Sequence, residues 1–315
     1  MALYVQTNVS SINAQRKLTN ATNSLNVSYQ RLASGLRINS SKDDAAGLQI
    51  SDRLTSQING LNQGNRNTND GIALAQTIEG ALDETTNMLQ RIRVLAVQSA
   101  NGTNTAEDRK ALQEEVEQLS LEISRIASQT TFAGATILDG TGDKSLVPNA
   151  AGANKGKLIF QVGANQGDTI SLVWSKAFNV SGLMEQTGKQ LGNNAAIGLT
   201  KVTMTVDGKK VSKAVFTVAT VSKANNTLAN IDAFIQAVDT KRAELGAIQN
   251  RMESAIRNQA NVAENESDAR SRIRDTDFAS ETAALTQNNI IQQASQSILA
   301  QANQRPTIAL SLLGG

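Results

Sequence analysis

Residues 33–54 read ASGLRINSSKDDAAGLQISDRL, and they separate two segments that have helical apolar periodicity. The stretch contains two glycines, Gly35 and Gly47, and the acidic pair Asp43-Asp44. Glycine permits backbone turns that a side chain would block. We therefore expect residues 34–47 to form a compact charged connector between two helices, close to the start of the chain.

The helical segment before the connector spans roughly residues 5–34. Leu18, Leu25 and Leu32 recur every seven residues along it, which is the spacing of a coiled-coil seam. The other positions are mostly Asn, Gln, Ser and Thr rather than Glu and Lys. Such a helix is weak by itself, so we expect it to need partner helices.

Four more helices are predicted after the connector. Apolar residues step by four and three positions along the first three, and the last carries Phe278, Leu285, Ile291, Ile298 and Leu299. The third helix of the chain, the second of these four, should begin after Thr105. Thr105 can cap it, and Glu107 and Asp108 lie in its first turn. The last helix should end near residue 303, before Pro306. The four expected ranges are about 45–99, 106–129, 227–272 and 278–303.

The middle of the chain has a different pattern. Residues 157–174 are typical of two strands around a Gly/Asn turn. Residues 201–218 alternate around Asp207-Gly208, which is a strong hairpin signal. The segments 139–157 and 186–200 are rich in Gly, Asn and Ala, and we expect loops there.

These patterns predict a mainly α fold class, because a long amphipathic seam has to be covered by another helix. We expect an elongated, coiled-coil-like helical rod with paired N- and C-terminal helices and a small β-hairpin region inserted mid-chain. Terminal helices that are poor at folding alone make sense if many copies complete one another. Head-to-tail contacts of this kind form a ring or a helical filament.

Composition narrows the range of functions. The chain has no His and no Cys, and only 3% of its residues are aromatic, so we expect neither an enzyme nor a cofactor or metal site. A net charge of +2 spread along the chain does not indicate nucleic-acid binding. No apolar run is long enough for membrane insertion. The N-terminus lacks the basic and apolar regions of a secretory signal peptide.

Several motifs resemble those of bacterial flagellins, in the same order along the chain. LRINSSKDDAAGLQISDRL is similar to the segment between the first two N-terminal helices of that family. Other motifs resemble the start of the family's chain, its first long rod helix, the approach to its β-hairpin, the hairpin itself and the C-terminus. They are MALYVQTNVSSINAQRKL (1–18), QRIRVLAVQSANGTN (90–104), QTTFAGATILDG (129–140), FQVGANQGDTISL (160–172), SRIRDTDFASETAALTQNNIIQQASQSILAQANQ (271–304) and LSLLGG (310–315).

The resemblance implies three domains. Residues 1–42 plus 276–315 would form a helical domain in the filament core. Residues 43–183 plus 226–275 would form a rod domain that carries the β-hairpin 157–174. Residues 184–225 would be a small β elaboration that faces outward.

The function that the resemblance implies is that of a structural subunit, which polymerises into the bacterial flagellar filament for swimming motility. The alternative is a flagellar hook–filament junction protein, whose termini are similar. We favour the filament subunit, because the motifs at 90–104 and 160–172 fit it better. Zinc-protease versions of flagellin need His on a helix, which this chain lacks.

The resemblance also implies assembly residues, in the terminal helices and in the connector. The connector residues would make charge-assisted contacts between neighbouring subunits. The alternative is an exposed polar linker, in which such ion pairs contribute little. The expected core-domain assembly residues are Leu18, Leu25, Leu32, Ile291, Ile298, Leu299, Leu312 and Leu313. The expected connector contacts are Arg37, Lys42, Asp43, Asp44 and Arg53.

Two further surfaces match positions that immune receptors read in flagellins. The vertebrate innate receptor for flagellin would recognise Arg91, Leu95, Gln98 and Glu115; Val94 departs from the family, where an acidic residue is common. Cytosolic sensors would read Leu310, Leu312 and Leu313, and the alternative role of these leucines is apolar burial in the filament core. Gly314-Gly315 follow them where some relatives have Arg. The triplet Asn-Gly-Thr at 101–103 matches a glycosylation acceptor, which we interpret as accidental.

The expected partners are other copies of the chain, a flagellar export chaperone at residues 275–315, and the filament cap and hook-junction proteins. The expected location is the flagellum outside the cell. Flagellins reach it unfolded, through the flagellar type III export pathway and without a cleaved signal peptide.

Overall fold

The computed structural model describes residues 7–140, 145–147, 156–174, 176–188, 198–206 and 209–313. The chain divides into two compact units. Unit 1 comprises Met1–Asn59 and Val262–Gly315, and unit 2 comprises Gly60–Asn261. Two long helices, α2 (Ala45–Ala100) and α6 (Val221–Arg274), contribute residues to both units.

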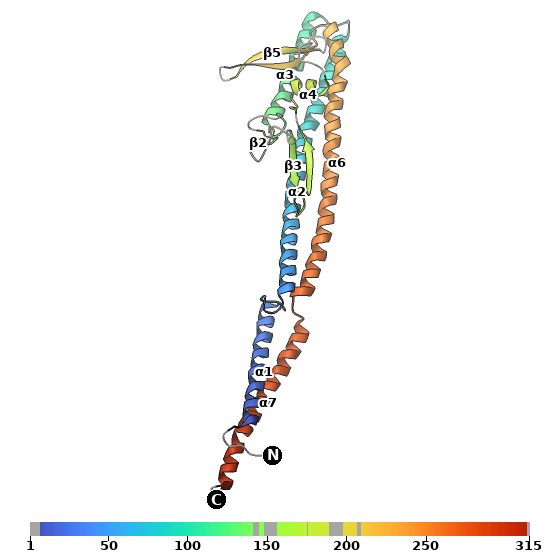
Figure 1. Cartoon of the computed structure of the whole chain (residues 1–315). Helices are drawn as coiled ribbons and strands as arrows, with labels where there is room; N and C mark the ends of the chain where they lie inside the picture. The colour runs from blue at the N-terminus through green and yellow to red at the C-terminus, as the bar shows by residue number, and fades with distance from the viewer. Residues whose placement is uncertain are drawn as a thin grey trace. The chain divides into compact units, whose positions relative to one another are not determined.

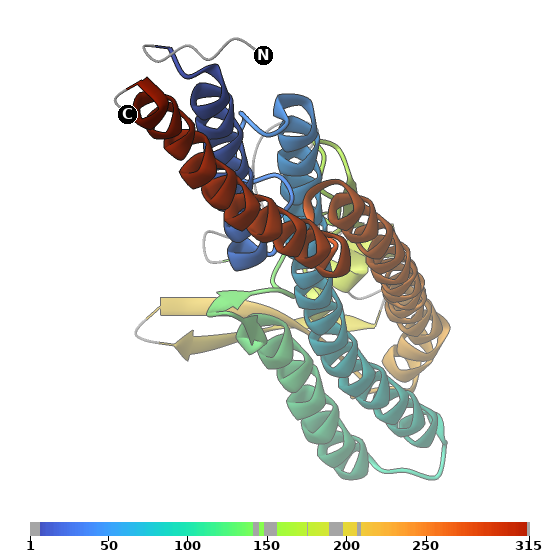
Figure 2. The same ribbon diagram turned by 90° about the horizontal axis from the view of Figure 1, so that it is seen from below.

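Unit 1 is built on the pair formed by α1 (Val9–Ser34) and α7 (Phe278–Leu313), which lie side by side and antiparallel (Figures 1 and 2). Gln292 Nε2 donates to Thr22 Oγ1 at 3.2 Å, and Arg31 pairs with Glu281 at 3.5 Å. The predicted pairing of N- and C-terminal helices is confirmed.

Small side chains form much of the α1 seam. Ala14, Ala21 and Ser28 are buried at heptad spacing, with Leu25 between them. Of the predicted seam leucines, only Leu25 is fully buried, and Leu18 and Leu32 are half-buried. Alanine and serine at the contact allow two helix backbones to approach closely, in contrast to the leucine-only seam that the sequence predicted.

Unit 2 contains most of α2 and α6 and all of α3 (Ala106–Gln129). The apolar steps along the second helix predicted a buried seam on α2, and all six of its residues, given at the end of this paragraph, are buried. Beside the apolar contact, polar groups join α2 to α6. Asp83 pairs with Arg242 at 2.9 Å, and Asp232 pairs with Arg93 at 2.8 Å. The α2 seam comprises Ile78, Leu82, Thr85, Leu89, Ile92 and Ala96.

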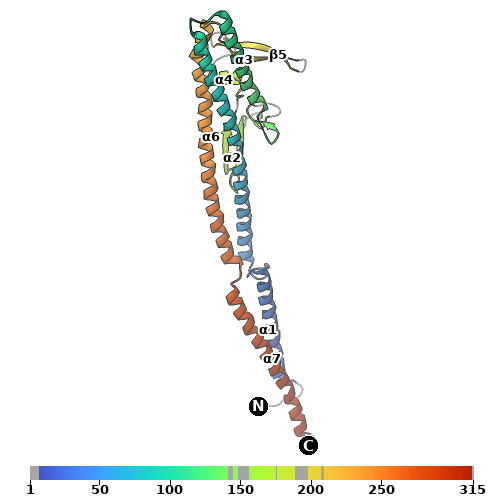
Figure 3. The same ribbon diagram turned by 180° about the vertical axis from the view of Figure 1, so that it is seen from behind.

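Within the described residues, three antiparallel strand pairs lie in the middle of the chain, in agreement with the small β region of the predicted fold class. The β3–β4 hairpin lies along α2 (Figure 3). The β5–β6 hairpin packs against α3, where the backbone N–H of Phe216 donates to Ser120 Oγ at 3.2 Å. The strands are β1 (Thr131–Phe132), β2 (Ala135–Thr136), β3 (Lys157–Gln161), β4 (Thr169–Val173), β5 (Leu199–Val206) and β6 (Lys209–Phe216).

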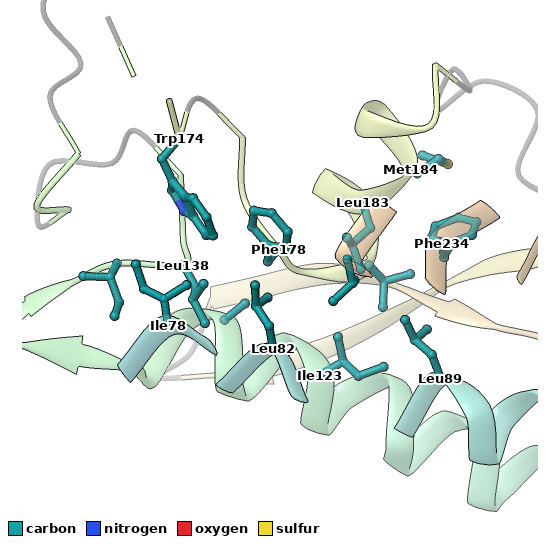
Figure 4. Packing of buried hydrophobic residues seen from close by; sticks show 14 of the residues in the cluster. Ile78, Leu82, Leu89, Ile123, Leu138, Trp174, Phe178, Leu183, Met184 and Phe234 are labelled. Atoms are coloured by element: carbon teal, nitrogen blue, oxygen red, sulfur yellow. The ribbon is translucent and has the colours of Figure 1, made fainter. Parts of the chain in front are cut away.

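One hydrophobic cluster fills unit 2, and its members lie between Leu74 and Met252 in the sequence. Figure 4 shows how α2, α3 and the segment after β4 converge in it. Trp174 stacks on Phe178 with ring centroids 4.5 Å apart, and the short helix α4 (Val180–Gln186) adds its own apolar residues. Most of the driving force for folding therefore lies in unit 2.

The helix boundaries differ from the predicted ones in three places. Helix α6 begins at Val221, six residues earlier than predicted. Helix α7 continues past Pro306 to Leu313, whereas the sequence predicted an end near 303. The sequence analysis did not predict α4. The predicted turn at Asp207-Gly208 lies outside the described residues.

Candidate assembly surface

The outer faces of α1 and α7 carry large apolar side chains that the described residues of unit 1 leave exposed. Val9 and Ile12 on α1 are 66% and 58% exposed. Ile290 and Ile298 on α7 are 61% and 56% exposed. Exposed apolar groups gathered on one helix pair mark a surface for association with another molecule.

The predicted assembly residues fall into three groups in this pair. Leu25 lies inside the α1–α7 contact, and Leu18, Leu32 and Leu299 border it. Ile291 and Ile298 are exposed and seven residues apart, so they share one face of α7. The side chains of Leu310, Leu312 and Leu313 lie outside the described residues, although the backbone of α7 includes these positions.

The connector is fixed to the junction of α6 and α7 by backbone hydrogen bonds within unit 1. The N–H of Arg37 donates to the carbonyl oxygen of Arg274 at 2.7 Å. The N–H of Thr276 donates to Gly35 at 3.0 Å, and Gly35 has φ +71°, which favours glycine. The Arg37 guanidinium donates to the carbonyl of Ile273 at 2.6 Å. The backbone and the side chain of Arg37 therefore both donate hydrogen bonds within the same chain.

Both connector aspartates also serve the fold of their own segment. Asp43 Oδ2 accepts hydrogen bonds from the backbone N–H groups of Asn39 and Ser40 at 3.1 and 2.9 Å. These bonds stabilise the carboxylate and lower the pKa of Asp43 below its usual value, the Ser40 bond having the largest effect. Asp44 Oδ1 accepts from the N–H of Gly47 at 3.0 Å and caps the start of α2.

Gly47 is required for a different reason from the one that the sequence suggested. It is a helical residue of α2 without a positive φ angle. A Cβ there would lie 2.7 Å from Ile38 Cδ1 and 2.5 Å from Asp44 Oδ2. The absence of a side chain allows the connector to fold back onto the first turn of α2.

Lys42 and Arg53 complete the predicted connector set. Both are exposed, and among the described residues neither forms an ion pair or a hydrogen bond. A recess of about 430 Å³ lies nearby in unit 1, between Arg37 and the start of α7, and Asp275, Asp277 and Glu281 contribute to its lining. The lining also includes the cationic Arg37 and Arg272, so the recess carries both signs of charge, and Lys42 and Arg53 lie free on the connector within the described part of the chain.

The residues predicted to form the innate-receptor surface do not all lie on the surface. Arg91 is exposed and Glu115 is half-buried, and the two side chains join α2 to α3 through an ion pair of 2.7 Å. Gln98 is exposed about two turns further along α2 than Arg91. Leu95, however, is only 1% exposed and belongs to the hydrophobic cluster. The helical spacing placed it near Arg91, but its side chain is buried, so Leu95 is corrected to a core residue.

Asn8 has a role that the sequence analysis missed. Its Oδ1 accepts from the N–H of Ser11 at 3.1 Å and caps α1. Its Nδ2 donates to the carbonyl oxygen of Ala302 at 2.7 Å. That carbonyl lies four residues before Pro306, which has no N–H to donate to it. The sequence did contain one sign of this role. Pro306 cannot donate to the carbonyl oxygen four residues before it, so a helix that continues past Pro306 needs another donor there.

No cluster of three or more Asp or Glu side chains could hold a metal ion in the described part of the chain. Among the described helices, none is long and apolar enough to cross a membrane.

A chain with paired terminal helices, apolar outer faces and its main core elsewhere belongs to the class of structural subunits that associate with further copies. The family model of the bacterial flagellin N-terminal helical region matches residues 5–143, and that of the C-terminal helical region matches residues 228–313. The chain therefore belongs to the bacterial flagellin family. Flagellins form the flagellar filament, so the protein is a structural subunit of this extracellular polymer.

Individual relatives agree with this assignment. Flagellin B of Vibrio cholerae is 39% identical over 382 residues, and polar flagellin B/D of Vibrio parahaemolyticus is 42% identical over 378 residues. Both alignments cover 100% of each chain. A Vibrio parahaemolyticus structure assigned to the flagellar hook-associated proteins is 15% identical, with a TM-score of 0.54 over 74% of this chain and 99% of that one. This likeness shows a shared fold alone.

Proposed function

We propose that this flagellin polymerises chiefly through unit 1, where the outer faces of α1 and α7 are buried against neighbouring copies. The observation that carries the proposal is the exposure of Val9, Ile12, Ile290 and Ile298 on a helix pair whose own seam contains mostly small residues. Burying an exposed isoleucine contributes about 1.5–3 kcal/mol. Many such contacts, repeated along a helical polymer, would supply the association energy.

Within this proposal, residues 1–42 and 276–315 line the filament core, residues 43–183 and 226–275 pack around it, and residues 184–225 face outward. The support is family membership together with the apolar faces of the terminal helices. Contacts within the chain divide it further along the long helices, after Asn59 and before Val262.

The connector would contribute contacts of another kind. Lys42 and Arg53 are the two predicted connector residues that have no partner among the described residues, so they are the candidates to pair with a neighbouring subunit. The acidic side chains of the recess beside Arg37 offer a complementary surface. Arg37, Asp43 and Asp44 would act indirectly, by holding the connector in shape.

Export and the remaining partners follow from the same organisation. The chain would leave the cell unfolded through the flagellar type III pathway, without a cleaved signal peptide. The small α1–α7 seam supports this route, because terminal helices with so little internal burial gain little by folding before assembly. The export chaperone would bind at residues 275–315. The filament cap and hook-junction proteins would contact assembled subunits, and an innate receptor would read the exposed Arg91 and Gln98 together with the half-buried Glu115.

Seeded polymerisation of the purified chain, followed by negative-stain electron microscopy, tests the role of unit 1. Ile298→Asn should greatly reduce filament yield, because it places an amide in the proposed contact. Val221→Asn is the matched control, since Val221 is an exposed apolar residue at the start of α6 in unit 2. Circular dichroism checks that both variants remain helical.

The outcomes separate the alternatives. Long filaments from the parent chain and from Val221→Asn, but not from Ile298→Asn, support the proposal. Normal filaments from Ile298→Asn would contradict the proposal and would indicate that unit 2 makes the main contacts between subunits. Short rings from the parent chain would instead point to a hook–filament junction protein. Lys42→Glu should weaken assembly without changing the helix content, and normal assembly would remove the connector from the interface.

A further inference from the structure

The chain contains two Asn–Gly pairs, Asn59-Gly60 and Asn101-Gly102, which differ in their surroundings. In such a pair the glycine backbone nitrogen can attack the Asn side-chain carbonyl carbon. A C–N bond forms, the side-chain nitrogen leaves as ammonia, and a succinimide ring results. Water then opens the ring at either carbonyl, which gives aspartate or isoaspartate. The reaction requires a free nitrogen and a backbone that can bring it to the side chain.

Asn101-Gly102 meets both requirements. The pair lies in the loop between the end of α2 at Ala100 and the start of α3 at Ala106, and both residues are exposed. Among the described residues, no hydrogen bond involves the Gly102 N–H or the Asn101 side-chain amide. No atom would lie within 4 Å of a Cβ added at Gly102, so the loop has space to rearrange.

Arg109 adds an electrostatic effect on the reacting peptide group. Its Nη2 donates to the backbone carbonyl oxygen of Asn101 at 3.0 Å, and its Nε donates to the carbonyl of Ser99 at 3.0 Å. The first carbonyl shares a peptide bond with the Gly102 nitrogen. When this nitrogen loses its proton, negative charge moves onto the oxygen that faces the guanidinium. The hydrogen bond therefore favours the nucleophilic form.

Asn59-Gly60 lacks these features, although its side chain is also exposed. The pair lies inside α2, where the Gly60 N–H belongs to the helical hydrogen-bond ladder. A Cβ added at Gly60 would be 2.7 Å from Ala164 Cβ, so the β3–β4 turn packs directly on this position. The helix would have to open before the ring could close.

We propose that Asn101 is a site of self-deamidation, promoted by Arg109, and that Asn59 is protected from the same reaction. The product places a negative charge just before the N-terminus of α3, where the helix dipole and Arg109 both stabilise it. The fold tolerates the change. Because the loop stays exposed after folding, the fraction of Asp and isoAsp at position 101 increases with the age of a subunit.

Peptide mapping by mass spectrometry tests the proposal on the full-length chain, after incubation at mildly alkaline pH. Trypsin separates the two sites, because residues 94–109 and 54–66 each end at an arginine and follow one. Asn101 should convert at least about tenfold faster than Asn59, which corresponds to a barrier difference of about 1.4 kcal/mol. In urea the two rates should converge, since both pairs are then in an unfolded chain.

Two variants sharpen the test. Gly102→Ala should slow conversion of Asn101 about tenfold and leave Asn59 unchanged, because a methyl group hinders the attacking nitrogen. Gly102 has no positive φ angle and open space around it, so alanine fits the fold. Arg109→Gln should slow conversion at Asn101 only, and an unchanged rate would overturn the role of Arg109. Equal rates at Asn101 and Asn59 in the folded chain would overturn the whole proposal.

Discussion

The Asn8 side-chain amide donates a hydrogen bond of 2.7 Å to the carbonyl oxygen of Ala302. This bond joins the first residues of α1 to α7 at the position where proline would otherwise leave a carbonyl without a partner. Asn8 also caps α1 through its other side-chain atom, so one residue stabilises both terminal helices. The two functions of Asn8 can be separated by mutation.

Asn8→Asp keeps an oxygen that can cap α1 and removes the donor to Ala302. We expect it to lower the free energy of unfolding of unit 1 by about 1–3 kcal/mol, the cost of leaving a buried acceptor without a partner. In the Pro306→Ala background the new N–H of residue 306 supplies the missing bond, so the same mutation should cost clearly less. The measurement is the dissociation temperature of filaments. Equal losses in the two backgrounds would show that Pro306 is unrelated to the bond.

Mutation of the two connector aspartates can distinguish a structural role of their carboxylates from a direct contact made by their negative charge. Asp43→Asn and Asp44→Asn retain acceptor oxygens for the backbone N–H groups that the carboxylates now bind. We expect both variants to polymerise, and Asp43→Lys and Asp44→Lys to fail, in the seeded assay. If the asparagine variants also fail, the negative charge itself contacts a neighbouring subunit, as the sequence analysis expected.

The capping box of α3 predicts a pH dependence. The carboxylate of Asp108 accepts from the backbone N–H of Thr105 at 2.8 Å and from its hydroxyl at 2.8 Å, so the pKa of Asp108 lies below its usual value of 3.8. A carboxyl with a lowered pKa in the folded state stabilises the fold above its unfolded pKa. This contribution is lost as the pH falls below 3.8 and through the folded value.

Carbon-13 NMR of the Asp108 carboxyl group checks this prediction. We expect a titration midpoint below 3.8, and Thr105→Ala should raise the midpoint partway, because it removes the hydroxyl donor and keeps the backbone donor. A midpoint that does not change in Thr105→Ala would mean that the hydroxyl does not bind the carboxylate in solution.

Two glycines of α2 should respond oppositely to alanine. A Cβ at Gly64 would lie 2.0 Å from the carbonyl oxygen of Val162, a backbone atom at the end of the β3–β4 hairpin. We expect Gly64→Ala to destabilise unit 2 by about 1–3 kcal/mol. Gly80→Ala meets no atom within 4 Å and should stabilise the helix by about 0.5–1 kcal/mol. Thermal unfolding followed by circular dichroism measures both, and a stabilised Gly64→Ala would show that the hairpin can move away.

The sequence predicted the regular helices well where capping and periodicity agree. Thr105 and the apolar steps from Leu112 to Ile126 predicted 106–129, which are the bounds of α3. The same rules extended poorly to α7. Pro306 normally ends a helix, but here the tertiary bond from Asn8 gives the carbonyl oxygen of Ala302 a donor. A contact between residues nearly three hundred positions apart leaves no local trace in the sequence.

The candidate site was predicted less completely. Leucine periodicity indicated the α1 seam, but Ala14, Ala21 and Ser28 were missed, since small residues carry little hydrophobic signal. Helical spacing cannot decide which side of α2 is covered, so Leu95 was assigned to a surface although it is buried. Charge alone also could not distinguish Asp43, which binds its own turn, from Lys42, which has no partner among the described residues.

The aromatic residues are divided between the two units. The chain has one Trp and two Tyr. Trp174 is buried in unit 2, whereas Tyr29 lies on α1 and Tyr4 precedes that helix in the sequence. Indole emission therefore reports on unit 2 alone, and phenol emission reports on the segment that pairs with α7. An unlabelled chain carries a separate optical reporter for each unit, so the order in which the two become structured during filament growth can be timed by intrinsic fluorescence.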